Sequence, residues 1–108
     1  MRYVFRVQEL ASVAVAGSAD VFPVHRIYCV GQNYANHARE MGSNPEREAP
    51  FFFSKPADAV CPDGSRLAFP LATENLNHEI ELVVAIGKKG TNILAAEARD
   101  YVFGYAVG

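Results

Sequence analysis

The sequence lacks several features that mark whole classes of protein. Cys29 and Cys61 are its only cysteines and form no CxxC pair, so neither a zinc knuckle nor a disulfide framework is indicated. No apolar run approaches the ~18 residues of a membrane span, and the start lacks the layout of a signal peptide. The net charge is −2 and no basic stretch is present, which argues against nucleic-acid binding. We therefore expect a soluble, cytoplasmic protein without nucleic-acid or membrane partners.

Half of the 108 residues are apolar and a fifth are charged. This composition fits one small domain, long enough for a single core and too short for two. There is no internal repeat and no low-complexity tract. The residue pattern predicts about seven short strands and two short helices. The expected fold class is therefore β-rich mixed α/β.

The N-terminus carries an alternating pattern. Apolar and mostly polar side chains alternate over residues 3–7, and Val13 and Val15 follow, which predicts two short strands around a turn. We take residues 1–21 as a short N-terminal strand segment. The other predicted strands and helices lie in residues 22–108.

Apolar runs predict the remaining strands. Residues 27–30 form a short run that ends at Gly31, and Phe51–Phe53 precede the interruption at Pro56. Such runs are typical of buried strands. Further strands are expected directly after a turn at Pro62-Asp63-Gly64, over residues 78–86 and over the C-terminal segment YVFGYAVG; residues 92–101 are expected to form one or two helical turns.

The segment NYANHAREMG is the clearest helix candidate. Asn33 can cap its N-terminus through the side-chain oxygen, and Gly42 can take the left-handed position at its end. The apolar stripe at helical spacing is formed by Tyr34, Ala38 and Met41. His37 and Glu40, three residues apart, share a face beside this stripe.

Two carboxylates open the strand HEIELVVAIG. Side chains alternate along a strand, so Glu79 and Glu81 project from one face, with Cα atoms about 6.5–7 Å apart. Carboxylates at this spacing can converge on a hard divalent cation such as Mg²⁺. The alternative is a solvent-facing strand, since charged residues normally point to water. On the residues alone both interpretations stay open.

Two further candidates carry acid–base or charge chemistry. Glu40 within reach of His37 would fix the imidazole tautomer and raise its basicity, which suits a general base acting on water; an exposed helical pair is the alternative. Lys55 could offer a point charge to an anionic substrate. Its spacing alone favours an ordinary exposed lysine at a strand end.

Four ordered blocks carry a family resemblance: RIYCVGQNYANHAREMG, PFFFSKPADAV, NLNHEIELVVAIGKKG and ARDYVFGYAVG. Together they resemble the fumarylacetoacetate hydrolase superfamily, and most closely its short bacterial branch that hydrolyses fumarylpyruvate or related acylpyruvates. The resemblance covers about residues 22–108 and implies that they are the N-terminal part of a fumarylacetoacetate hydrolase-like catalytic domain. Residues 1–21 add nothing to it.

The resemblance implies a rolled mixed β-sheet with a short lid helix, a homodimer, and a bound Mg²⁺ or Mn²⁺. Glu79 and Glu81 match the two metal-binding glutamates of the family. His37 and Glu40 match its water-activating pair. Lys55 matches the lysine of its KP motif, near the substrate.

The implied substrate is a small 2,4-dioxo acid, whose carbon–carbon bond is cleaved to release pyruvate. Gln32, Asn33 and Tyr34 lie in the first matching block and are expected to contact this substrate. Many relatives carry Arg where this chain has Gln32, which weakens the expected grip on a distal carboxylate. The third metal ligand of the family is an aspartate beyond the segment that ends at Gly108. The resemblance thus implies that the chain is an incomplete and, by itself, inactive portion of the enzyme.

Two alternatives remain at the level of sequence. An isomerase or decarboxylase of the same superfamily would stabilise the same enolate with the same metal site. A non-catalytic β-rich interaction domain would leave Glu79 and Glu81 facing solvent, and its folding would be indifferent to metal ions.

Overall fold

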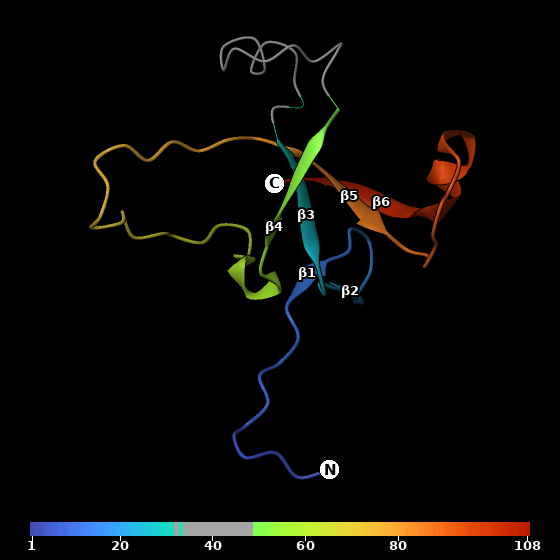
Figure 1. The fold of residues 1–108 in the computed structure, drawn as a ribbon. Helices are drawn as coiled ribbons and strands as arrows, with labels where there is room; N and C mark the ends of the chain where they lie inside the picture. The colour runs from blue at the N-terminus through green and yellow to red at the C-terminus, as the bar shows by residue number, and fades with distance from the viewer. Residues whose placement is uncertain (32, 34–48) are drawn as a thin grey trace. The chain divides into compact units, whose positions relative to one another are not determined.

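The structure is a computed structural model that describes residues 1–31, 33 and 49–108. These residues form six strands and two 3-10 helices (Figure 1). The chain divides into two units, Met1–Arg66 with β1–β4 and Leu67–Gly108 with β5 and β6. In chain order the elements are β1 (Ser12–Ala14), β2 (Val21–Pro23), β3 (Ile27–Gly31), β4 (Phe51–Lys55), η1 (Ala57–Ala59), β5 (Leu82–Ile86), η2 (Ala95–Tyr101) and β6 (Val102–Val107).

The strands pair as three antiparallel two-stranded sheets, β1–β2, β3–β4 and β5–β6. The prediction of a β-rich chain is confirmed for the described residues, with six strands where about seven were expected. The lid helix over NYANHAREMG lies outside the described residues apart from Asn33. Among the described residues, no helix has the length and apolarity needed to cross a bilayer.

The first sheet is a hairpin around Gly17. Gly17 has a φ of +73°, a left-handed conformation that glycine adopts without steric cost. The Ser18 N–H donates to the Val15 carbonyl at 3.2 Å, and the Ser18 side chain accepts from the Asp20 N–H at 3.0 Å. This turn sets the register in which Val13 lies opposite Phe22.

The strand expected over residues 3–7 is not formed, so that prediction was wrong. Tyr3 and Phe5 are 62% and 84% exposed, and no described residue makes a backbone hydrogen bond to this segment. Alternation shows which side chains could share a face. A strand also needs a partner for its N–H and C=O groups.

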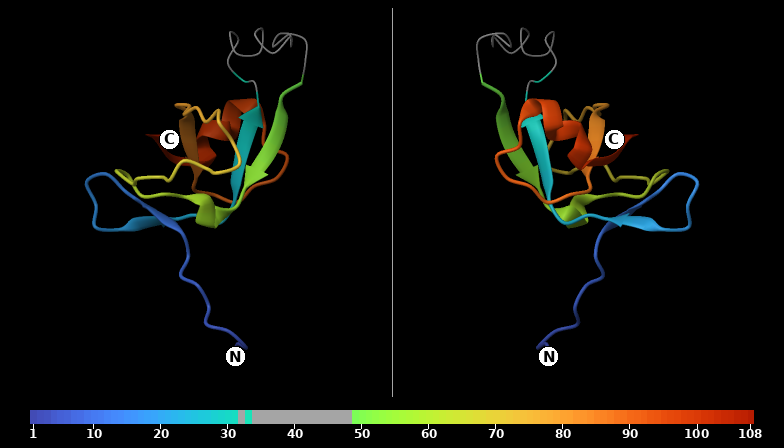
Figure 2. Two further views of the ribbon diagram at one scale, coloured as in Figure 1. Left: turned by 90° about the vertical axis from the view of Figure 1, so that its left-hand side faces the viewer. Right: turned by 90° about the vertical axis from the view of Figure 1, so that its right-hand side faces the viewer.

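The second sheet confirms both of its predicted strands. β3 and β4 lie side by side (Figure 2), with Ile27 opposite Lys55 and Gly31 opposite Phe51. A β-carbon built on Gly31 would fall within the ring of Phe51. Glycine therefore fits the end of β3 because the aromatic ring of the neighbouring strand occupies the place of a side chain.

The turn at Pro62-Asp63-Gly64 is confirmed. The Ser65 N–H donates to the Pro62 carbonyl at 3.1 Å, and Gly64 has a φ of +76°. The short strand expected directly after this turn is absent. Pro70 follows closely, and proline limits strand pairing because it has no N–H to donate.

The third sheet begins later than predicted. The strand expected over residues 78–86 is assigned only over β5 (Leu82–Ile86). Its partner β6 and the helical turns of η2 are both confirmed. A β-bulge lies between Ala85 and Ile86, where the pairing shifts from Ala85–Gly104 to Ile86–Val102.

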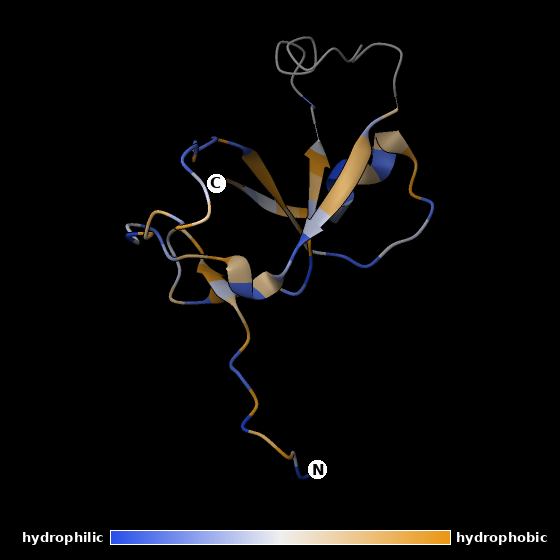
Figure 3. Ribbon diagram, turned by 60° about the vertical axis from the view of Figure 1, so that its left-hand side comes forward, coloured by the Kyte–Doolittle hydropathy of each residue, from blue (hydrophilic) through white to orange (hydrophobic). Residues whose placement is uncertain are grey.

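The apolar strands are exposed, which corrects the expectation that they would be buried. No described side chain is fully buried, and Phe52, Leu82 and Ile86 are 64%, 63% and 60% exposed. Figure 3 shows the apolar colouring of β3–β6. Two strands alone cannot enclose a core, since a sheet buries its apolar face only against another layer.

Candidate metal and substrate site

The β5–β6 hairpin places Glu81 directly opposite Gly108. The Glu81 N–H donates to the Gly108 carbonyl at 2.7 Å, and the Gly108 N–H donates to the Glu81 carbonyl at 3.0 Å. Two bonds exchanged in this way define a hydrogen-bonded antiparallel pair, whose Cα atoms are about 5.5 Å apart. The backbone of Glu81 is thus held at the end of the ladder, one residue before β5 begins.

The two faces of this hairpin differ in character. Residues paired across an antiparallel ladder share a face, and the faces alternate along each strand. On the Glu81 face, β6 presents only small residues, Gly104, Ala106 and Gly108. On the opposite face, Leu82 lies opposite Val107 and Val84 opposite Tyr105, among other apolar side chains. The acidic side chain therefore stands on the face where β6 has almost no side-chain bulk.

Glu79 precedes the ladder in extended chain without an assigned strand. Both Glu79 and Glu81 are exposed, and neither has a hydrogen bond or ion pair from its side chain to another described residue. Their carboxylate oxygens are hard donors of the kind that Mg²⁺ and Mn²⁺ take. The carboxylate oxygens of Glu79 and Glu81 are therefore of the chemical type that binds a divalent cation, and they make no side-chain hydrogen bond or ion pair to another described residue.

Two carboxylates do not complete such a site. Mg²⁺ requires near-octahedral coordination by oxygen. Among the described residues no group of three or more His, Cys, Asp and Glu side chains could hold a metal ion. The remaining positions would have to be filled by water, by substrate oxygens or by a further ligand.

A polar turn ahead of Glu79 was missed at the level of sequence. The Asn75 N–H donates to Thr73 Oγ1 at 3.1 Å, and Thr73 Oγ1 donates to the Asn75 carbonyl at 3.3 Å. Asn77 Nδ2 donates to Asn75 Oδ1 at 3.0 Å. The signal was present in the pattern Thr-x-Asn-x-Asn, because these side chains readily bond to nearby backbone. This turn shapes the chain just before the acidic pair.

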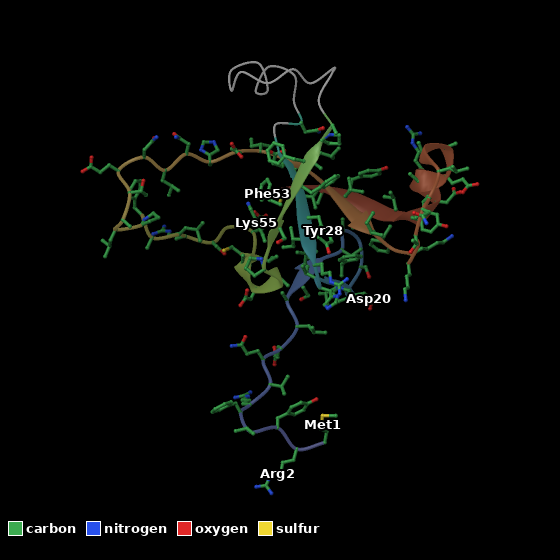
Figure 4. The ribbon with its side chains drawn as sticks, in the orientation of Figure 1. Met1, Arg2, Asp20, Tyr28, Phe53 and Lys55 are labelled. Carbon is green, nitrogen blue, oxygen red and sulfur yellow. The ribbon has the colours of Figure 1, made fainter. Side chains whose placement is uncertain are left out.

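Lys55 is the last residue of β4 and lies opposite Ile27. Alternation along the ladder places it on the same face as Phe53 and Cys29, whereas Tyr28 lies on the other face; Figure 4 labels Lys55, Phe53 and Tyr28. Lys55 is exposed. Pro56 follows and is the N-cap of η1, so the strand ends where the lysine stands.

The other predicted site residues are outside the part of the chain that the structure describes. These are Gln32, Tyr34, His37 and Glu40. Asn33 is described and exposed. Its predicted capping role concerns a helix that lies outside the described residues, so this role stays a prediction. In sequence these positions lie between β3 and β4, the sheet that carries Lys55.

Comparison with known proteins identifies relatives of the whole chain. Residues 26–108 match the family described as fumarylacetoacetate (FAA) hydrolase C-terminal. The structure matches a fumarylpyruvate hydrolase from Pseudomonas aeruginosa, solved in complex with Mn²⁺ and pyruvate, with a TM-score of 0.90 and 55% identity over 98% of this chain. A putative fumarylpyruvate hydrolase from Burkholderia cenocepacia matches with a TM-score of 0.83 and 50% identity over 99% of this chain.

Curated relatives give a second description. A mitochondrial oxaloacetate tautomerase from Bos taurus is 49% identical over 81 residues, which is 75% of this chain. The chain spans only 36% of that tautomerase. It likewise spans 47% and 45% of the two bacterial structures. The similarity therefore covers less than half of each of these relatives.

Proposed function

The chain belongs to the fumarylacetoacetate hydrolase family, and we propose from this premise that it forms part of a metal-dependent hydrolase of 2,4-dioxo acids. The substrate would be fumarylpyruvate or another acylpyruvate, cleaved to pyruvate and a carboxylic acid. The observation that carries the proposal is the match, at 55% identity and a TM-score of 0.90, to a fumarylpyruvate hydrolase that binds Mn²⁺ and pyruvate. The exposed pair Glu79 and Glu81 supplies the matching donor chemistry.

Glu79 and Glu81 would hold the divalent cation, either Mg²⁺ or Mn²⁺. When bound, the cation would act as a Lewis acid toward the carboxylate and 2-oxo group of the substrate, and stabilise negative charge that develops there. The ladder bonds between Glu81 and Gly108 support this assignment because they fix the backbone of one ligand. A ligand whose backbone is already fixed loses less freedom on binding than one on a mobile segment.

His37 would accept a proton from water, with Glu40 holding the imidazole in the required tautomer. The hydroxide adds to the carbonyl carbon distal to the substrate carboxylate. The carbon–carbon bond then breaks, its electron pair leaves with the three-carbon part as an enolate, and protonation of that enolate gives pyruvate. The other product is the carboxylic acid formed from the attacked carbonyl.

Lys55 and the segment Gln32–Tyr34 would bind the substrate. The ammonium of Lys55 attracts an anionic substrate as a point charge. Gln32 can donate a hydrogen bond to a distal oxygen, although as a neutral amide it binds a carboxylate less strongly than a guanidinium does. These contacts orient the dioxo acid for attack.

We propose that the chain is one part of a longer catalytic domain. The support is its coverage of the two bacterial structures, of which it spans 47% and 45%. In an antiparallel ladder, residues placed after Gly108 would run beside Ile80 and Glu79. A carboxylate supplied there would add a third ligand to the pair. By itself the 108-residue chain would then hold Mg²⁺ weakly and be inactive, since two ligands leave the octahedron largely to water.

We also propose a cytoplasmic homodimer. The paired strands expose apolar surface, including Phe51, Phe52 and Tyr105 at 51%, 64% and 63% exposure; the rest of the domain would cover part of it, and a second copy could cover the remainder. Surfaces of this kind associate with further protein. Sedimentation of the purified protein would test the dimer.

A second candidate activity is tautomerisation of oxaloacetate. It is favoured by the 49% identity to the bovine oxaloacetate tautomerase over 81 residues. Both reactions pass through an enolate next to a carboxylate, as would decarboxylation. The described residues would support hydrolysis, tautomerisation and decarboxylation equally, so they do not distinguish the three reactions.

The test begins with the intact mass of the purified protein, compared with its coding sequence. Fumarylpyruvate is then supplied with Mn²⁺ or Mg²⁺, and pyruvate release is followed through lactate dehydrogenase. Pyruvate release that Glu79→Gln abolishes supports the hydrolase. Interconversion of oxaloacetate tautomers without pyruvate release would instead support the tautomerase, and release of carbon dioxide the decarboxylase.

A further inference from the structure

The glycine opposite Glu81 is constrained by a side chain on the neighbouring strand. A β-carbon built on Gly108 would lie 2.9 Å from Cγ2 of Val83. Carbon atoms that are not bonded to each other pack at about 3.5–4.0 Å. Glu81 pairs with Gly108 and Val83 pairs with Ala106, so Val83 is the diagonal neighbour of Gly108 on the same face of the ladder, and the contact follows from the register.

Val83 is 42% exposed, so its own conformational preference, and not packing by neighbouring atoms, holds its side chain in place. Its branched β-carbon leaves few favoured side-chain rotamers, and the residue lies within β5, paired with Ala106. An alanine at position 108 would therefore require either a less favoured rotamer of Val83 or a displacement of the end of β6. The hydrogen bonds that connect this end to β5 are the two that hold Glu81.

Gly104 provides an internal comparison. It is on the same strand and the same face, opposite Ala85, yet a β-carbon built on it meets nothing within 4 Å. The lack of room for a β-carbon at position 108 is thus specific to the residue paired with Glu81. It is not shared by all the small residues on this face of the ladder.

We propose that Gly108 is a positioning residue for Glu81. Its missing side chain, required by Val83, keeps the reciprocal backbone bonds intact. It also leaves open the space beside the Glu81 carboxylate, where a paired side chain would otherwise stand about 5 Å away. The consequence for metal binding rests on the proposed function, whereas the consequence for the ladder does not.

The test compares Gly108→Ala with the matched control Gly104→Ala in the protein as it is encoded. Amide hydrogen exchange at Glu81, measured by NMR, reports the ladder without any metal. Gly108→Ala should raise this exchange rate at least tenfold, and Gly104→Ala should leave it within about twofold. Titration with Mn²⁺, followed by electron paramagnetic resonance, should show affinity about tenfold weaker for Gly108→Ala, the lower end of the effect of residues that orient a metal ligand.

The double variant Val83→Ala/Gly108→Ala gives the decisive comparison. It removes Cγ2, so Glu81 exchange and Mn²⁺ affinity should return toward those of the unmodified protein, and Val83→Ala alone should change neither. If Gly108→Ala behaves like Gly104→Ala, the positioning role is wrong. If the unmodified protein binds no Mn²⁺, the proposed metal site fails, and amide exchange alone still decides the role of Gly108. Should Gly108→Ala fail to fold, recovery of Glu81 protection in the double variant supports the proposal, and its absence overturns it.

Discussion

The ring of Phe51 covers the α-carbon of Gly31 across the β3–β4 ladder, in the place that a side chain would occupy. Gly31 closes β3, and Phe51 opens β4. The residues between them in sequence include the predicted acid–base pair. The packing of one ring on one glycine thus fixes the two strand ends from which that segment departs.

Gly31→Ala should destabilise the protein because its β-carbon would fall within the Phe51 ring. Because Phe51 is half-exposed and its ring can partly move aside, we expect a loss of about 1 kcal/mol, the lower end of the cost of overpacking a core. Urea unfolding would measure the change, with Gly104→Ala as a control in which the new β-carbon meets nothing within 4 Å. The double variant Gly31→Ala/Phe51→Leu should recover part of the loss. Equal stability of Gly31→Ala and the unmodified protein would contradict the packing.

Local chemistry predicted the turns and most strands correctly. Gly17 and Gly64 adopt the left-handed conformation that their turns require, and the apolar runs form β3, β4 and β6. The errors have one physical source, which is that pairing is not local. Residues 3–7 have a strand pattern without a described partner, and the strand expected from residue 78 is assigned only from Leu82.

Burial could not be predicted for a related reason. An apolar run such as Phe51–Phe53 indicates that a strand can be buried, but the layer that covers it comes from elsewhere. The candidate site likewise combines features that the local sequence predicts with features that depend on how distant segments pair. The sequence predicted Glu81 and Lys55 as site residues, and these roles stay predictions, whereas the opposition of Glu81 to Gly108 depends on the register of β5 and β6 and became visible only in the structure.

Loss of either proposed acidic ligand should weaken metal binding strongly. Glu81→Gln and Glu79→Gln remove one charge each with little change in shape. We expect Mn²⁺ affinity to fall by more than the ~10–100-fold that loss of a merely orienting residue causes. Glu97→Gln is the matched control, since Glu97 is an exposed acid in η2. Calorimetric titration would measure the change, and unaltered affinity in Glu81→Gln would remove Glu81 from the site.

His37→Asn and Glu40→Gln should separate catalysis from metal binding. Loss of a general base lowers kcat by about 10²–10⁴-fold, while Mn²⁺ affinity should stay unchanged because the acidic pair is intact. Pyruvate release at saturating substrate would measure kcat, and paramagnetic resonance the affinity. A parallel loss of both quantities would indicate a structural role for the pair.

Lys55→Met should raise KM more than it lowers kcat, since the ammonium is proposed to attract the substrate and not to react with it. Lys88→Met is the control, because Lys88 is an exposed lysine that follows β5. A rise in KM of about tenfold corresponds to the loss of one hydrogen bond to a charged group, roughly 1.5 kcal/mol. Steady-state kinetics at several ionic strengths would measure it. A similar effect in both variants would point to the overall field of the protein rather than to Lys55.

Removal of the metal should lower thermal stability if the acidic pair binds it in the folded state alone. A ligand present at 100 times its Kd stabilises the folded protein by about 2.7 kcal/mol. Treatment with EDTA should therefore reduce Tm, and added Mn²⁺ should restore it in a concentration-dependent way. Glu81→Gln should show no such response, because it retains only one ligand of the pair. The same rise in Tm for Glu81→Gln would mean that Mn²⁺ binds elsewhere, whereas no rise in either protein would favour the metal-indifferent interaction domain.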